Sequence, residues 1–377
     1  MSCFGYQQRM KCRPKQKQKS ARRKFAVIDL FCGAGGLAFG LKTAGLHVAA
    51  GVDLDPHCKH PLEKNTGAKF HLCDISGVTS NDLSAWFGSA EVRVLAGCAP
   101  CQPFSTYSQS RKSKDGRWSL LQHFQRLVEE TKPEIVTMEN VPGLATQKVW
   151  AAFISALKRL GYNVSWREVN CQDYGVPQSR RRLVLLGSLL GPIELIKPKS
   201  IEVKTVQHAI GGLPAIAAGA SCPIDNLHTS ASLSDKNLER IRASNPGGTW
   251  RDWPFDLRAE CHTKITGKTY PSVYGRMEWT KPAPTMTTQC YGFGNGRFGH
   301  PDQDRAISLR EAAILQSFPI DYSFVNNESK IAFQNIGTLI GNAVPPKLGE
   351  AIGRSIKSHV RRIARQRNID ASDALQQ

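Results

Sequence analysis

The chain has 377 residues, enough for one large domain and a smaller one, and its 41% hydrophobic and 21% charged residues are typical of a globular protein. Its 50 Lys and Arg against 31 Asp and Glu give a net charge of +19, which favours a polyanionic partner, most simply nucleic acid. Eleven irregularly spaced cysteines, without a signal peptide or an apolar run long enough to cross a membrane, argue against a secreted or membrane protein and predict a cytoplasmic one.

The amino-terminal segment 1–24 carries nine basic residues and no acidic one. Subtracting these nine charges from +19 leaves +10 on the remainder, so the body of the protein is basic as well. We expect the segment to be a disordered, solvated tail, with a nucleic-acid-binding arm as the alternative. A second basic, polar tail is expected at 361–377.

The first structured unit begins with the apolar run 25–31, which is typical of a buried strand. The glycine-rich turn 32–36 follows, and then a helical stretch at 37–43. A strand, a glycine turn and a helix form the first unit of a nucleotide-binding α/β fold, where missing side chains let the backbone approach a ligand.

Acidic residues follow the next two strands. The strand 47–52 ends in Asp53, 18 residues beyond Gly35, where a carboxylate can accept hydrogen bonds from ribose hydroxyls. A third strand is expected to end at Asp74, where the carboxylate could contact an adenine. The pattern fits NAD and S-adenosylmethionine, but the phosphate-binding G-x-G-x-x-G order is absent, which favours the phosphate-free cofactor.

A proline-rich loop with two cysteines, 97–105 (GCAPCQPFS), follows the apolar strand 92–95. It projects Cys101 from the carboxyl edge of the sheet, where ligands bind in open α/β folds. A nucleophilic thiol needs a setting that lowers its pKa. Cys98 and Cys101 are also spaced like a redox pair or half a zinc site, although no second pair follows and Pro103 hinders a helix. A structural turn, a redox pair and a nucleophile all remain open on this loop alone.

Charged residues flank the next strands. The basic stretch 107–118 is expected to be a mobile loop that can close over a polyanion. After a helix at 120–131, the strand 133–138 ends in Glu139. Burial would make this carboxyl a proton donor near neutral pH, while a helix cap or an ion pair is the alternative.

Three arginines precede the apolar strand 183–186, which comes after a helix at 149–160. Alternation along an extended chain places Arg180 and Arg182 on the same face. Buried arginines are costly without anionic partners, so they are expected to bind a phosphate or carboxylate or to lower the pKa of the thiol.

The segment 191–334 has weak periodicity and many loop residues, which predicts a second, smaller domain. A helix with a capping box, Ser308 to Glu311, lies within it, and Asn342 precedes a final amphipathic helix. The basic and aromatic residues of the segment 191–334 could read base edges, although half of them could instead be ordinary packing and solvated charge. These are Trp250, Arg251, Trp253, Arg258, Lys264, Lys268, Tyr291 and Arg297.

Six ordered stretches together resemble the DNA cytosine-C5 methyltransferase family over residues 25–353. They are FAVIDLFCGAGG, GCAPCQPFS, ENVPG, QSRRRL, SLREAAILQSFP and IGNAVPP. The resemblance implies an α/β, Rossmann-like S-adenosylmethionine-dependent methyltransferase domain at 25–190. The C-terminal segment 335–360 would complete this domain beside the first strand, and 191–334 would form a smaller target-recognition domain across a DNA cleft.

The resemblance also implies roles for individual residues. S-adenosylmethionine would be held by Phe31, Gly33, Gly35, Asp53, Asp74 and Asn342. Cys101 would be the nucleophile that forms an adduct with C6 of a flipped cytosine, and Glu139 the acid on that base. Arg180 and Arg182 would orient and polarise the site, and no metal ion is implied.

The expected substrate is a specific short sequence in double-stranded DNA, methylated by a monomer that protects DNA in a restriction-modification system. A cognate restriction endonuclease would act independently. An RNA methyltransferase of the same superfamily is the nearest alternative, but the Cys-Phe-Thr triplet of the tRNA-methylating relatives is absent between Gly191 and Ser308. A catalytically silent DNA-binding protein and a redox protein remain as alternatives of other classes. Intact Cys101 and Glu139 argue against the first, and the other five stretches argue against the second.

Overall fold

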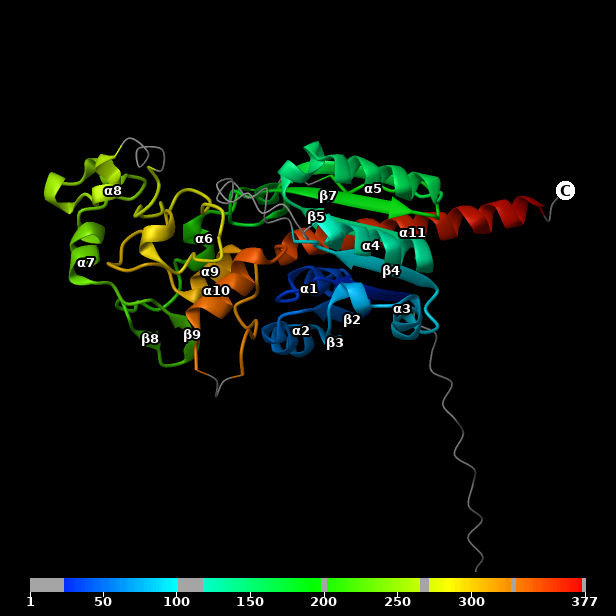
Figure 1. The fold of residues 1–377 in the computed structure, drawn as a ribbon, viewed down its shortest axis with the longest axis horizontal. Helices are drawn as coiled ribbons and strands as arrows, with labels where there is room; N and C mark the ends of the chain where they lie inside the picture. The colour runs from blue at the N-terminus through cyan, green and yellow to red at the C-terminus, as the bar shows by residue number, and fades with distance from the viewer. Residues whose placement is uncertain (1–23, 101–117, 198–201, 265–270, 327–329, 375–377) are drawn as a thin grey trace, which may run out of the picture.

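The computed structural model describes residues 24–100, 118–197, 202–264, 271–326 and 330–374. A seven-stranded sheet in the order β3-β2-β1-β4-β5-β7-β6 forms its centre (Figure 1). The strands are β1 (Phe25–Leu30), β2 (Val48–Asp53), β3 (Lys69–Leu72), β4 (Val92–Gly97), β5 (Ile135–Asn140), β6 (Asn163–Asn170) and β7 (Arg181–Ser188).

The strands β3, β2, β1, β4 and β5 run parallel, whereas β7 is antiparallel to both of its neighbours. Every residue of β1 and β5 is buried, as their largely apolar sequences predict for strands covered on both faces. The chain leaves β1 on one side for β2 and later enters β4 on the other. The carboxyl edge beside β1 and β4 is therefore a topological switch point, where α/β sheets bind ligands.

Helices cover both faces of the sheet (Figure 1). One core cluster packs against α3 (Ser80–Phe87), α4 (Trp118–Thr131) and α5 (Lys148–Arg159). The other includes side chains of α1 (Gly36–Thr43), α2 (Lys59–Thr66) and α11 (Pro346–Ala374). These two layers confirm the predicted α/β, Rossmann-like class.

The C-terminal helix α11 returns to pack along α1. Its buried residues Leu348, Ile352 and Ile356 form the apolar face expected from the sequence. The two backbones approach closely, because a Cβ atom on Gly40 would lie only 2.4 Å from the carbonyl oxygen of Pro346. The helix continues to Ala374, so that much of the expected tail 361–377 is helical.

A second lobe lies beyond the carboxyl edge of the sheet (Figure 1). Its regular elements are α6 (Val206–Ile210), β8 (Ser221–Cys222), β9 (Asp225–Thr229), α7 (Asp235–Arg242), α8 (Glu260–Thr263), α9 (Leu309–Leu315) and α10 (Phe333–Asn342). The predicted capping box is confirmed: the Ser308 hydroxyl accepts a hydrogen bond from the Glu311 amide, and the Glu311 carboxylate accepts one from the Ser308 amide. The same buried carboxylate pairs with Arg305 through two contacts of 2.7 Å, tying α9 to the lobe.

Candidate active site

The glycine turn after β1 is held in an unusual conformation. Phe31, Gly33 and Gly35 all have positive φ, at 61°, 51° and 80°. That region is easy for glycine but uncommon for a bulky residue such as phenylalanine. The Asp53 carboxylate fixes the turn, because it accepts hydrogen bonds from the amides of Gly33 (2.9 Å) and Asp55 (3.0 Å). Strand β1, its turn and the end of β2 are thus locked together.

The other two cofactor candidates lie at element ends. Asp74 follows β3 and accepts a 2.7 Å hydrogen bond from the Ser76 amide. Hydrogen bonds from the side chain and backbone of Ser76 lower the pKa of this exposed carboxyl, which favours its charged form. Asn342 is the last residue of α10 and is exposed.

Sequence reasoning missed a buried carboxyl group beside this turn. Asp29 in β1 is 1% exposed, and within the described ranges neither of its oxygens has a hydrogen-bond partner. Burial raises its pKa to about 7, and the nearby charge of Asp53 adds to the increase. The Ala38 amide is near enough to oppose this shift, but it is not in hydrogen-bond geometry. The only sequence signal was an acid within an otherwise apolar strand.

Glu139 at the end of β5 is the centre of a compact polar group. It is 2% exposed, and its Oε2 accepts a 3.0 Å hydrogen bond from the Cys98 thiol. Its Oε1 lies 2.8 Å from Nε of Arg182, an ion pair whose angle falls outside hydrogen-bond geometry. The carboxylate is therefore held from both sides, which fixes its direction.

Cys98 acts here as a hydrogen-bond donor. Burial raises the pKa of its thiol far above the ordinary value, and the charge and hydrogen bond of Glu139 raise it further. The thiol therefore stays protonated, and a protonated thiol is a poor nucleophile. Nearby, the side-chain amide of Asn140 donates a 2.9 Å hydrogen bond to the backbone carbonyl of Ala99, which anchors the start of the proline-rich loop.

Arg180 and Arg182 share a face, as the alternation predicted, while Arg181 between them is exposed. The two have different partners. The buried Arg180 guanidinium donates to the carbonyl oxygens of Met286 (2.9 Å) and Gly341 (3.0 Å). Burial lowers its pKa to about 9, with the charge of Arg182 contributing, so that Arg180 remains a cation at neutral pH. It joins the sheet to the second lobe, at Met286 and at Gly341 in α10.

Other predicted site residues lie outside the described ranges. Cys101 is one, together with nearly all of the basic stretch 107–118. The described part of the site therefore contains the groups that surround the start of the loop, namely Cys98, Glu139 and Arg182.

Of the two interpretations of the second lobe's basic and aromatic residues, ordinary packing applies to both indole rings. Trp250 and Trp253 are 3% and 2% exposed and belong to the core of this lobe. Two of the predicted cations are engaged by backbone: Arg258 donates to the carbonyl of Trp253, and Arg297 to that of Gly248. Small lobes bury their large aromatic rings first, and composition alone could not separate these rings from a binding surface.

The described residues contain neither a cluster of metal ligands nor a membrane-spanning helix. Nowhere in these ranges do three or more His, Cys, Asp or Glu side chains gather as metal ligands would. None of the helices in the same ranges is both long and apolar enough to cross a membrane.

Known sequences match this chain over nearly all of the residues from β1 to α11. The family described as C-5 cytosine-specific DNA methylase matches residues 25–358. The type II methylase M.HgiDII of Herpetosiphon aurantiacus is 50% identical over 338 residues, covering 88% of this chain and 95% of the relative. The type II methyltransferase M1.HphI of Haemophilus parahaemolyticus is 34% identical over 336 residues, covering 87% and 86%.

Solved structures have the same architecture. A DNA modification methyltransferase encoded within an E. coli prophage superposes with a TM-score of 0.70 at 26% identity, covering 89% of this chain and 99% of its own. The Dnmt2 methyltransferase of S. pombe reaches a TM-score of 0.59 at 17% identity, with coverages of 87% and 96%. The second likeness concerns the fold alone.

Proposed function

Since this chain belongs to the C-5 cytosine-specific DNA methylase family and is a DNA (cytosine-5-)-methyltransferase, we propose that it acts through a covalent adduct between Cys101 and C6 of cytosine. The observation that carries the proposal is the buried Glu139 carboxylate, fixed by Cys98 and Arg182 at the carboxyl edge of β5. It lies beside the strand that leads into the cysteine loop, since β4 and β5 are neighbours.

The residues supply the chemistry that cytosine lacks. Cytosine C5 is a poor nucleophile, so direct methylation is slow. The Cys101 thiolate would attack C6 and form a C–S bond, while Glu139 hydrogen-bonds or protonates N3, and the electron pair of the C5–C6 double bond becomes available at C5. After methylation, loss of the C5 proton restores the double bond and expels the thiolate. Arg182 would keep the Glu139 carboxylate aimed at the base.

The turn after β1 fits the methyl donor. S-adenosylmethionine is the methyl donor of this family, and when bound it supplies an electrophilic methyl group. The left-handed turn exposes backbone rather than side chains, and the fixed Asp53 carboxylate can accept hydrogen bonds from a ribose. Phe31, Gly33, Gly35, Asp53, Asp74 and Asn342 would hold the donor.

The substrate would be a cytosine flipped out of a specific short sequence in duplex DNA, because a base inside the stack cannot be approached by a thiolate. The second lobe would read that sequence. The names of the type II relatives support a protective role in a restriction-modification system. The enzyme would act as a monomer, and any cognate endonuclease would act independently.

The decisive experiment is transfer of labelled methyl from S-adenosylmethionine to duplex DNA and to tRNA, with Cys101→Ser alongside. We expect C5-methylcytosine in one short DNA motif by base-resolved mapping, no transfer by the variant, and largely retained donor binding. Label only in tRNA would overturn the DNA substrate, and active Cys101→Ser would overturn the adduct.

A further inference from the structure

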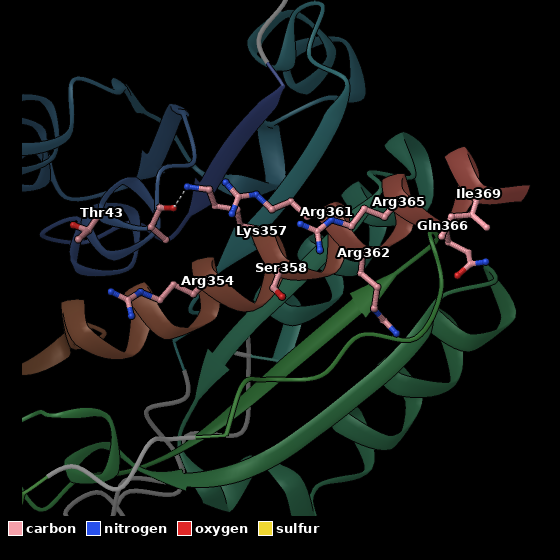
Figure 2. Close-up of a pocket in the computed structure, with 10 residues that line it drawn as sticks. Thr43, Arg354, Lys357, Ser358, Arg361, Arg362, Arg365, Gln366 and Ile369 are labelled. Carbon is pink, nitrogen blue, oxygen red and sulfur yellow. Dashed lines mark hydrogen bonds between the residues drawn. The ribbon is translucent and has the colours of Figure 1, made fainter. Parts of the chain in front are cut away.

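A groove on the outer side of the sheet domain is lined by cations (Figure 2). It has a volume of about 810 Å³ and lies between the end of α1 and the stretch of α11 from Arg354 to Ile369. Arg354, Lys357, Arg361 and Arg365 line it, at spacings of three, four and four residues. Such spacings repeat one face of a helix, so the four cations form a continuous stripe. At 1.5 Å per residue the stripe is about 16 Å long.

The charge of this helix segment is one-sided. Between Glu350 and Asp370 the sequence contains six Lys or Arg residues and no acid. An ordinary solvated helix alternates charges, because like charges three or four residues apart repel one another. Here the repulsion is uncompensated along most of the segment, as expected for a surface that meets a polyanion.

The cations of the stripe differ in how far they are already engaged. Arg354 pairs with Glu350 on its own helix. Lys357 donates a 2.8 Å hydrogen bond to the Ala44 carbonyl, which is marked by the dashed line in Figure 2. Arg361 and Arg365 are exposed, and across the described part of the chain neither has a hydrogen bond or ion pair. Two guanidinium groups, each with five donors in a planar fork, are therefore available at the centre and end of the stripe.

The groove lies far from the candidate active site. Helix α1 runs back from the glycine turn, so its end at Thr43 lies at the amino edge of the sheet, opposite Phe31 and Glu139. Figure 1 shows α11 extending past the sheet on the side away from the second lobe. Strand β1 also begins at this edge, and Lys24, the last of the nine cations of the sequence 1–24, directly precedes it.

We propose that this stripe is a second DNA-contacting surface, which binds the phosphodiester backbone outside the catalytic cleft and without regard to sequence. Guanidinium groups match phosphate oxygens in geometry and charge. A protein partner would be expected to need apolar or aromatic anchors, whereas among the described residues the apolar ones that line the groove are Ala44 and Ile369. Contact at this edge would hold the enzyme on long DNA while the cleft samples sites.

The test uses the full chain with Arg361→Gln and Arg365→Gln combined, since neither side chain supports the fold by a polar contact. The matched control combines Lys158→Gln and Arg159→Gln. These two cations are exposed in the last turn of α5, on the opposite face of the sheet, and their loss changes the charge equally. Binding of a duplex of about 40 base pairs without a methylation site is measured against salt, with polyglutamate as a second probe.

We expect the groove variant to bind the duplex about tenfold more weakly at 0.1 M salt, and its salt slope to fall by about two, the value for two lost phosphate contacts. The control should keep the wild-type slope. Turnover on a short duplex with a mapped methylation site should be equal in all three proteins. Equal duplex binding by both variants would overturn the proposal. Loss of polyglutamate binding with unchanged duplex binding would also overturn it and assign the groove to an acidic protein segment. Absent turnover in the wild type would instead count against the proposed function.

Discussion

Asp29 offers a direct test of the electrostatics of the sheet, because Asp29→Asn removes its ionisable group and nearly preserves its shape. The pKa of Asp29 is about 7 in the folded protein, against an ordinary 3.8. The folded state therefore keeps this proton over a range of pH in which the unfolded chain has lost it. The stabilisation linked to Asp29 is complete below about pH 4 and is lost as pH rises to about 7.

The size of the effect follows from the shift. Each pH unit within this range changes the free energy of unfolding by about 1.4 kcal/mol. Between pH 5 and pH 8 the wild type should therefore lose about 3 kcal/mol relative to Asp29→Asn. Urea unfolding of both proteins at the two pH values measures this difference, and any fixed cost of burying the amide cancels.

The exposed Asp256 supplies the control, because Asp256→Asn should change the free energy of unfolding equally at pH 5 and pH 8. If Asp29→Asn behaves like this control, the buried carboxyl does not take up a proton in this range. In that case the Asp29 carboxyl would have a hydrogen-bond partner or contact with solvent in the folded protein.

Three further substitutions address the site. Cys98→Ser should keep most methyl transfer, because a hydroxyl can replace the thiol as donor to Glu139; a loss equal to that of Cys101→Ser would argue against a single nucleophile. Glu139→Gln should lower kcat about 100-fold or more, and near-normal turnover would remove Glu139 from acid catalysis. Arg180→Lys should lower the thermal midpoint, since an ammonium group cannot reproduce the fork that donates to Met286 and Gly341, and each lost contact is worth about 1–3 kcal/mol. An unchanged midpoint would mean that the second lobe is held mainly by apolar packing.

Local patterns in the sequence predicted the elements of this protein well. The apolar run before Phe31, the box from Ser308 to Glu311 and the alternation of Arg180 and Arg182 each have a period or spacing that one element dictates. The glycine turn and its link to Asp53 were predictable for the same reason, because the glycines and Asp53 lie within one strand-turn-helix unit and the strand after it.

Contacts between distant segments were not predictable. The acceptors of Arg180 lie 106 and 161 residues further along the chain, so no local pattern distinguishes a site arginine from one that joins two lobes. The Cys98–Glu139 hydrogen bond needs β4 and β5 as neighbours, and a run of apolar residues does not predict the order of strands in a sheet. The sequence left open whether Trp250 and Trp253 pack or bind, because burial depends on what surrounds a ring.

The packing of α11 on α1 has a consequence for synthesis of the protein. Helix α1, which follows the glycine turn, remains uncovered during synthesis until the segment from Pro346 onward has been made, because its cover begins there. A product truncated before that point would contain Cys101, Glu139 and Asp53 yet expose the apolar side of α1. Exposed apolar surface favours aggregation and proteolysis, so such a fragment is expected to be short-lived.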